Sequence, residues 1–198
     1  MKKFLLVILI VISFAASSAM AGIIFQPKPV MLEIENVTQE HENWCWAAIV
    51  QQLTAGYGGP APLSQCQLVN EANADQGVMG QDCCQENPEE LSEDSLCSRF
   101  ANQFELVTLI NRHGGWVYGV ALPNSPEEVR EYLEAGQALI VGIKIDQDRY
   151  HAYLVRGISW EGEQAMLTIN DPAKSGSQTV PYDQVRPEWI MTQVVKKS

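Results

Sequence analysis

Three side chains in this sequence have the types, and the order along the chain, of a nucleophile, a base and an orienting acid. Cys45 follows a polar loop, His151 opens the apolar run 151–155, and Asp171 lies twenty positions after the histidine. A cysteine deprotonated by a histidine that a carboxylate orients is an arrangement for nucleophilic attack on a carbonyl carbon. Each residue alone has an ordinary alternative: a buried or disulfide-bonded cysteine, a histidine at a sheet edge, and an aspartate that begins a turn. The combination of all three residues in this order favours a catalytic role over these ordinary alternatives.

The residues after Cys45 predict a helix with the cysteine in its first turn. Gly56 ends the pattern, and a second break follows it. Four apolar residues recur at helical spacing: Trp46, Ile49, Val50 and Leu53. Unpaired backbone N–H groups and the positive end of the helix dipole meet at such a position, and both stabilise a thiolate.

A second feature of the same loop is Gln39, six positions before Cys45. Attack on a carbonyl group places negative charge on its oxygen, which fixed hydrogen-bond donors must stabilise. The backbone N–H of Cys45 supplies one donor, and the carboxamide of Gln39 is the candidate for the second. Asn43 is the competing donor, although it also suits the cap of the helix.

The number of cysteines is odd, and all five follow the first forty residues: Cys45, Cys66, Cys83, Cys84 and Cys97. The last four lie in a polar, cysteine-rich excursion of about residues 64–98 that has few large apolar residues to pack. A bridge between the adjacent Cys83 and Cys84 would be strained. The pairing is therefore either 66–83 with 84–97 or 66–84 with 83–97, and Cys45 remains the free thiol. No C-x-x-C pair and no histidine lies in the excursion, so a metal site is not expected there.

The N-terminus predicts export. Two lysines precede the apolar run 4–14, and small residues follow as far as an A-x-A cleavage pattern at residues 19–21. This is the pattern of a secretory signal peptide, residues 1–21, and it is too short for a membrane-spanning helix. The mature chain, residues 22–198, is then secreted or periplasmic, with no membrane partner after cleavage. Disulfide bonds persist in such compartments.

Length and charge restrict the class of protein further. The mature part suits one domain with a sizeable core. The whole chain has a net charge of −11, and the signal peptide contains two lysines and no acid, so the mature charge is −13. Such acidity argues against nucleic acid as a partner.

The elements that must position these residues are helices first and a sheet second, which predicts an α+β domain. The helical segments are expected at residues 45–56, 64–72, 96–112 and 125–136. The strands are expected at residues 28–37, 116–120, 139–145, 150–158, 166–169 and 176–182. His151 then lies at the mouth of one strand and Asp171 at the end of its antiparallel neighbour, so the two side chains can meet.

These motifs resemble papain-like cysteine peptidases over about residues 30–185. They resemble in particular a bacterial branch with a Trp-Cys-Trp-Ala-Ala sequence at the nucleophile, here residues 44–48. In that branch the third catalytic residue is typically the aspartate of an Asp-Pro turn, as at Asp171. Exported members also carry Ser-Gln-Cys, Cys-Cys and Cys segments, here residues 64–66, 83–84 and 97.

The resemblance implies a papain-like fold, in which an N-terminal helical part with the nucleophile helix packs on a C-terminal antiparallel sheet. It implies that Cys45 is the nucleophile, that His151 is the base and then the acid, and that Gln39 is the oxyanion donor. Asp171 would be the third catalytic residue, with the neighbouring Asn170 as the alternative, because papain uses an asparagine.

The activity that follows is hydrolysis of peptide or amide bonds in a peptide or protein substrate through a thioester, with no metal or organic cofactor. Two other functions stay open. A transglutaminase-like acyltransferase would pass the thioester to an amine, and a non-catalytic secreted binding module would keep the fold with Cys45 bridged or its cleft filled.

Overall fold

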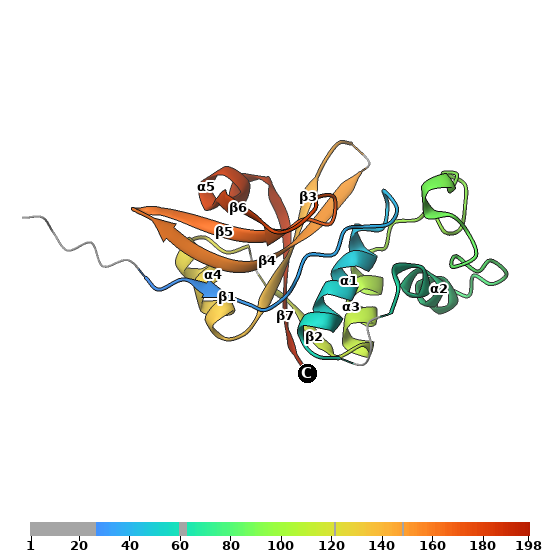
Figure 1. Ribbon diagram of the computed structural model, residues 1–198, viewed down its shortest axis with the longest axis horizontal. Helices are drawn as coiled ribbons and strands as arrows, with labels where there is room; N and C mark the ends of the chain where they lie inside the picture. Colours follow the sequence, from blue (N-terminus) through green and yellow to red (C-terminus); the bar gives the residue numbers. More distant parts are fainter. Residues whose placement is uncertain (1–26, 60–62, 121, 148) are drawn as a thin grey trace, which may run out of the picture.

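The computed structural model describes residues 27–59, 63–120, 122–147 and 149–198, and the predicted signal peptide, residues 1–21, lies outside them. Within the described residues, five α-helices combine with one seven-stranded antiparallel sheet (Figure 1). This is the α+β class that the sequence predicts. No helix in that part of the chain is long and apolar enough to span a lipid bilayer.

Helices α1, α2 and α3 lie together at one end of the molecule, and the sheet extends away from them towards the other end (Figure 1). The helices are α1 (Cys45–Gly56), α2 (Gln65–Asp75), α3 (Gln103–Arg112), α4 (Pro126–Glu134) and the short α5 (Tyr182–Val185). The strands are β1 (Val30–Met31), β2 (Gly115–Val120), β3 (Ala138–Lys144), β4 (Tyr150–Glu161), β5 (Gln164–Asn170), β6 (Gln178–Pro181) and β7 (Trp189–Lys197).

Helix α1 begins at Cys45 and ends at Gly56, as predicted, and it is a core helix. Nine of its twelve residues are buried. A Cβ atom at Gly56 would lie 2.6 Å from Cγ1 of Ile34, so this glycine allows the preceding chain segment to pack directly on the helix end. The nucleophile candidate is therefore carried by an element that has little freedom to move.

Helix α3 is shorter than the predicted helix at residues 96–112. Asn102 accepts a hydrogen bond from the backbone N–H of Glu105, and the Glu105 side chain accepts one from the backbone N–H of Asn102. This capping box starts the helix at Gln103. Residues 96–101 form no helix, and Cys97 within them is held by a disulfide bond.

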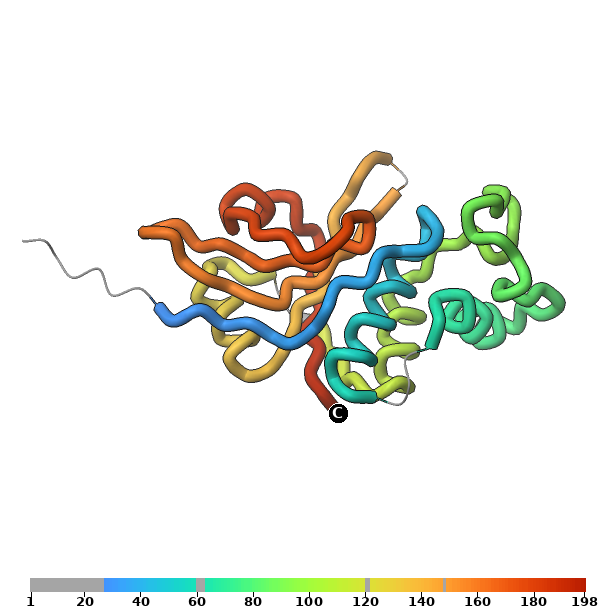
Figure 2. Tube along the Cα trace, viewed as in Figure 1, coloured from blue at the N-terminus to red at the C-terminus, as the bar shows by residue number. Residues whose placement is uncertain are grey.

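The sheet has the strand order β2-β7-β3-β4-β5-β6, with β1 paired to β4. The long strand β4 pairs with β3 along its first half and with β1 farther on, where Val30 lies opposite Ile158. The predicted strand at residues 28–37 is therefore mostly wrong. After Met31 the chain leaves the ladder, and residues 32–39, called the strap below, run between the sheet and α1 (Figure 2).

Strand β7 was not predicted from the sequence, although it lies between β2 and β3. Its polar residues Thr192 and Gln193 interrupt the apolar pattern, yet both are buried.

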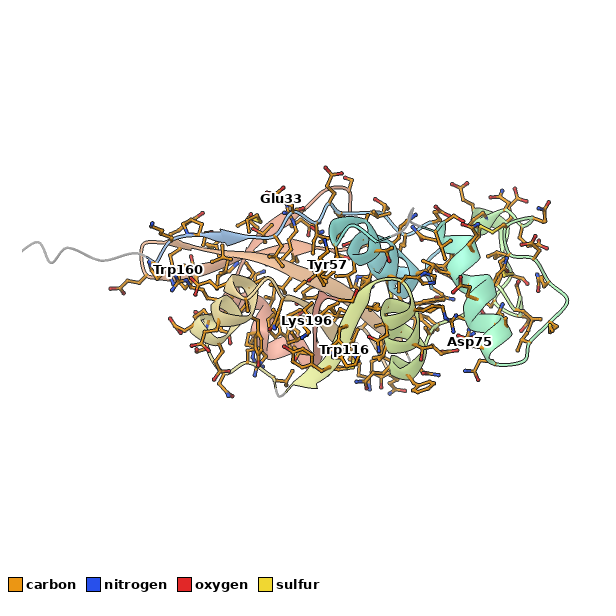
Figure 3. The ribbon with its side chains drawn as sticks, turned by 90° about the horizontal axis from the view of Figure 1, so that it is seen from below. Glu33, Tyr57, Asp75, Trp116, Trp160 and Lys196 are labelled. Carbon is orange, nitrogen blue, oxygen red and sulfur yellow. A yellow bond between two sulfur atoms is a disulfide. The ribbon has the colours of Figure 1, made fainter. Side chains whose placement is uncertain are left out.

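The core consists of two hydrophobic clusters, one around α1, α2 and α3 and one between α4 and the sheet. Tyr57, directly after α1, lies between helices and sheet (Figure 3), where its hydroxyl donates to the Val195 carbonyl at 2.7 Å and accepts from the Ala138 N–H at 3.1 Å.

Two disulfide bonds hold the excursion, and they join Cys66 to Cys84 and Cys83 to Cys97. This is the second of the two pairings that the sequence allows. Cys83 and Cys97 are buried in the helical cluster, whereas Cys84 is exposed. Cys45 is free.

Candidate active site

Cys45 is the first residue of α1, where the backbone N–H groups have no partner within the helix. The preceding Trp44 is at the N-cap position and makes no side-chain capping bond. Asn43 does not cap the helix either, because its Nδ2 donates to the Ser98 hydroxyl at 3.3 Å. Cys45 is only 6 % exposed, and it lines a cavity that is described below.

The two tryptophans beside Cys45 fix the start of the helix. The indole nitrogen of Trp44 donates to the carbonyl of Cys97 at 2.7 Å, and that of Trp46 donates to the carbonyl of Arg99 at 3.2 Å. Buried indole groups need such partners. The end of the excursion therefore packs against the start of α1, and its Cys83–Cys97 disulfide supports the segment that accepts both bonds.

His151 and Asp171 meet at one edge of the sheet. His151 is near the beginning of β4, and Asp171 directly follows β5, its antiparallel neighbour. Nε2 of His151 lies 2.6 Å from Oδ1 of Asp171. The other ring nitrogen, Nδ1, is not engaged by Asp171, and Cys45 lines the same cavity as the imidazole and interacts with it electrostatically. The structure thus brings together three of the four predicted residues.

The electrostatic interactions in this group stabilise the charged forms of both His151 and Asp171. Burial opposes the charge on His151, but the interactions with Asp171 and with the sulfur of Cys45 outweigh it and raise the pKa of His151 to about 9. Burial also opposes the charge on Asp171, yet hydrogen bonds from His151 and from the backbone N–H of Ala173 hold the pKa of this carboxyl below its usual range. Near neutral pH the pair is an imidazolium beside a carboxylate.

The adjacent Asn170 does not contact the histidine. Its side chain is fully buried, with Nδ2 donating to the carbonyl of Ile34 at 3.0 Å and Oδ1 accepting from Nε of Arg156 at 3.1 Å and from the Ser177 hydroxyl at 2.7 Å. Asn170 therefore joins the strap to β5. Of the two alternatives for the third residue, Asp171 is the one at the imidazole.

A cavity of about 370 Å³ opens beside Cys45 and His151. Its apolar walls come from three parts of the chain: Trp46 on α1, Phe100 and Leu106 around the start of α3, and Ala152, Ile190 and Met191 on the sheet. The wall formed by Ile190 and Met191 was not predicted from the sequence, because strand β7 was not predicted. Trp44, on the other side of Cys45 in the sequence, is fully buried and is not part of this wall.

Gln39 lies on the loop before α1 but does not line this cavity. Its Nε2 donates to the carbonyls of His41 at 2.9 Å and Glu42 at 2.7 Å, while its Oε1 is buried without a hydrogen-bond partner. The residue lines a neighbouring polar hollow of about 500 Å³. Donation from Gln39 to a substrate oxygen would require Nε2 to give up one of these two carbonyls.

Sequence reasoning missed the residues that join the two halves of the site. Asn36 on the strap donates to carbonyls in the turn after β5 and accepts from Gln52 on α1. A lone asparagine in a segment expected to be a strand carries no signal of such a role. The other histidines lie apart from the cavity, His41 against the ring of Trp44 and His113 beside Glu71.

No cluster of three or more histidine, cysteine, aspartate or glutamate side chains suited to a metal ion occurs in the ranges that the structure describes. No protein-family model matches the chain, and no curated protein matches it. The assignment of this site therefore depends on the chemistry and geometry of its residues.

Proposed function

We propose that this chain is a cysteine hydrolase of papain-like fold that cleaves peptide or amide bonds. The observation that carries the proposal is the line of side chains from Cys45 through His151 to Asp171, with 2.6 Å between the last two. A free cysteine at a helix start, a charged imidazole and a buried carboxylate are the groups that thiol-based acyl transfer needs.

The acylation step starts from the thiolate of Cys45 and the imidazolium of His151. The sulfur attacks the substrate carbonyl carbon, and the electron pair of the C=O bond moves to the oxygen. The Cys45 backbone N–H donates to that oxyanion, and Gln39 adds a second donor when its Nε2 gives up one of its two carbonyl partners. As the tetrahedral intermediate collapses, the C–N bond breaks, and His151 gives its proton to the leaving amine. The product is a thioester on Cys45.

Deacylation uses the same groups in reverse. Neutral His151 removes a proton from a water molecule, and the hydroxide attacks the thioester carbon. The C–S bond breaks, the carboxylic acid leaves, and the thiolate–imidazolium pair is restored. Asp171 keeps the ring oriented in both steps, because its carboxylate accepts from Nε2 and leaves Nδ1 towards the sulfur.

The cavity supports a substrate with an apolar side chain close to the reacting carbonyl. Phe100 and Ile190 on its walls are 44 % and 51 % exposed, and burying such side chains against a ligand is favourable. Two disulfide bonds support residence in an oxidising compartment, in keeping with the predicted signal peptide at residues 1–21.

The test is hydrolysis of a peptide library by the mature chain, with Cys45→Ala as the comparison. The wild type should cleave, and loss of the nucleophile should lower the rate by on the order of 10⁶-fold. A parallel reaction with an added primary amine separates hydrolysis from acyl transfer, since an acyltransferase would form the amide of the added amine. Equal cleavage by wild type and variant would rule out the proposed mechanism.

A further inference from the structure

The strap crosses the boundary between the two halves of the site. It lies between α1, which carries Cys45, and the turn after β5, which carries Asp171 (Figure 2). Its backbone is tied to the sheet side twice, because Leu32 donates to the carbonyl of Arg156 at 2.8 Å and Gln39 donates to that of Pro172 at 2.8 Å.

One side chain of the strap contacts both halves. Nδ2 of Asn36 lies within hydrogen-bond distance of three carbonyls of the turn, which share its two N–H groups, at 3.2 Å for Asp171, 2.8 Å for Lys174 and 3.0 Å for Gly176. Oδ1 of the same asparagine accepts from Nε2 of Gln52, a side chain of α1 that is 1 % exposed. An asparagine is suited to this place because it offers both donors and an acceptor.

The turn closes on itself without Asn36, since Lys174 donates to the Asp171 carbonyl at 3.0 Å and Ala173 donates to the Asp171 carboxylate at 2.9 Å. Those local bonds set the shape of the turn. They do not set its place relative to α1, which depends on contacts that cross between the two elements.

We propose that Asn36 is a positioning residue that holds the Asp171 turn at a fixed place on the nucleophile helix. Through Asp171 it fixes the imidazole of His151 relative to the sulfur of Cys45. This inference rests on the function proposed above. A displacement of about 1 Å between reacting groups can cost on the order of 10²-fold in rate, so a distant hydrogen-bond bridge matters to the reaction.

The test uses iodoacetate as the probe of Cys45, measured against pH on the disulfide-bonded mature chain, because the imidazolium attracts the carboxylate of this probe and the rate falls when that charge is lost. The ionisable groups facing His151 are Cys45 and Asp171, and Lys174 lies near the carboxylate. In Asn36→Ala the alkaline limb of the alkylation profile, which reports the imidazolium, should move down by about one pH unit or more. The rate constant near neutral pH should fall by on the order of 10-fold to 100-fold.

A matched control separates positioning from general stability. Asn70 on α2 also joins a helix to a distant loop, with Nδ2 donating to Asp82 at 2.7 Å and Oδ1 accepting from the backbone of Cys83 at 2.8 Å. Asn70→Ala should lower the free energy of unfolding but leave the alkaline limb in place. An Asn36→Ala profile that superimposes on the wild-type profile would overturn the proposal.

A second variant covers the case in which Asn36→Ala does not fold. Gln52→Met keeps the volume of the side chain and the bonds of Asn36 to the turn, but it removes the link from α1 to Asn36, together with the bond from Gln52 to the Val37 carbonyl of the strap. It should move the same limb in the same direction by a smaller amount, and an unchanged limb would contradict the positioning role. The wild type must also differ from His151→Ala in this assay. If those two profiles agree, the proposed function itself fails, whatever the Asn36 variant shows.

Discussion

Nε2 of His151 lies 2.6 Å from Oδ1 of Asp171, and this contact decides which ring nitrogen faces the nucleophile. Because the carboxylate engages Nε2, the proton exchanged with Cys45 must move through Nδ1. The predictions below follow from this arrangement and from the contacts that support it.

The raised pKa of His151 predicts that the rate of peptide hydrolysis has an alkaline limit. The imidazolium is needed to stabilise the thiolate and to protonate the leaving amine, so the rate should fall as pH rises through about 9. His113→Ala is the control, because that histidine also has a carboxylate partner, Glu71, but lies outside the cavity. A limb that disappears in His113→Ala rather than in His151→Ala would contradict the assignment.

The same pKa predicts a pH dependence of stability. His151 holds its proton more tightly in the folded chain than in the unfolded chain, for which the ordinary value is 6.5. Its contribution is therefore complete below about pH 6.5 and is lost as pH rises through about 9. Urea unfolding at pH 6 and pH 10 should show a larger decrease in the free energy of unfolding for the wild type than for His151→Ala.

The two candidate oxyanion donors can be separated by substitution. Gln39→Ala should lower kcat by about 10²- to 10³-fold if its amide donates in the transition state. Asn43→Ala should have a much smaller effect, because the Asn43 amide donates to Ser98. The measurement is kcat on a peptide that the wild type cleaves. The reverse order of effects would assign the role to Asn43.

The two disulfide bonds should differ in their effect on activity. Each closes a short loop, of 14 residues for Cys83–Cys97 and 18 for Cys66–Cys84, so loss of either should lower the free energy of unfolding by about 3 kcal/mol. Only the former supports the carbonyls that hold the indoles beside Cys45. Paired serine substitutions should therefore reduce alkylation of Cys45 more strongly at Cys83–Cys97, under conditions in which both variants remain folded.

The apolar cavity should lose volume in Gly142→Ala. A Cβ at this position would lie 3.1 Å from Cε of Met191, on the cavity wall, and nothing in the backbone angle of Gly142 requires glycine. The ratio of kcat/KM for peptides with large and small apolar side chains should decrease. Gly119→Ala on β2 is the control, since a Cβ there has no neighbour within 4 Å. An unchanged ratio would show that the substrate side chain does not enter this cavity.

The sequence predicts best where local chemistry is strong. The helix that starts at Cys45, the strand that begins near His151 and the placing of Asp171 at the end of the next strand all follow from periodicity and turn residues. Tertiary contacts decide the rest. Residues 32–39 have the composition of a strand, but Asn36 and Gln39 bind the turn after β5 instead of a ladder.

Two further misses have physical causes as well. Strand β7 contains Thr192 and Gln193, whose burial depends on neighbouring strands and is invisible in a local window. The orientation of the Gln39 amide is set by the carbonyls of His41 and Glu42, which only the folded loop brings within reach. The types of residues in the sequence do not determine the orientation of a side-chain amide such as that of Gln39.

The distance in sequence between Cys45 and His151, 106 positions, has a consequence for the timing of reactivity. The sulfur belongs to a helix made early in synthesis, and the imidazole belongs to a sheet that closes only after β7, at the C-terminal end, has been inserted between β2 and β3. A nascent chain therefore has a thiol without its partner. On the proposed mechanism, such a chain is unreactive towards peptides until the last strand has docked.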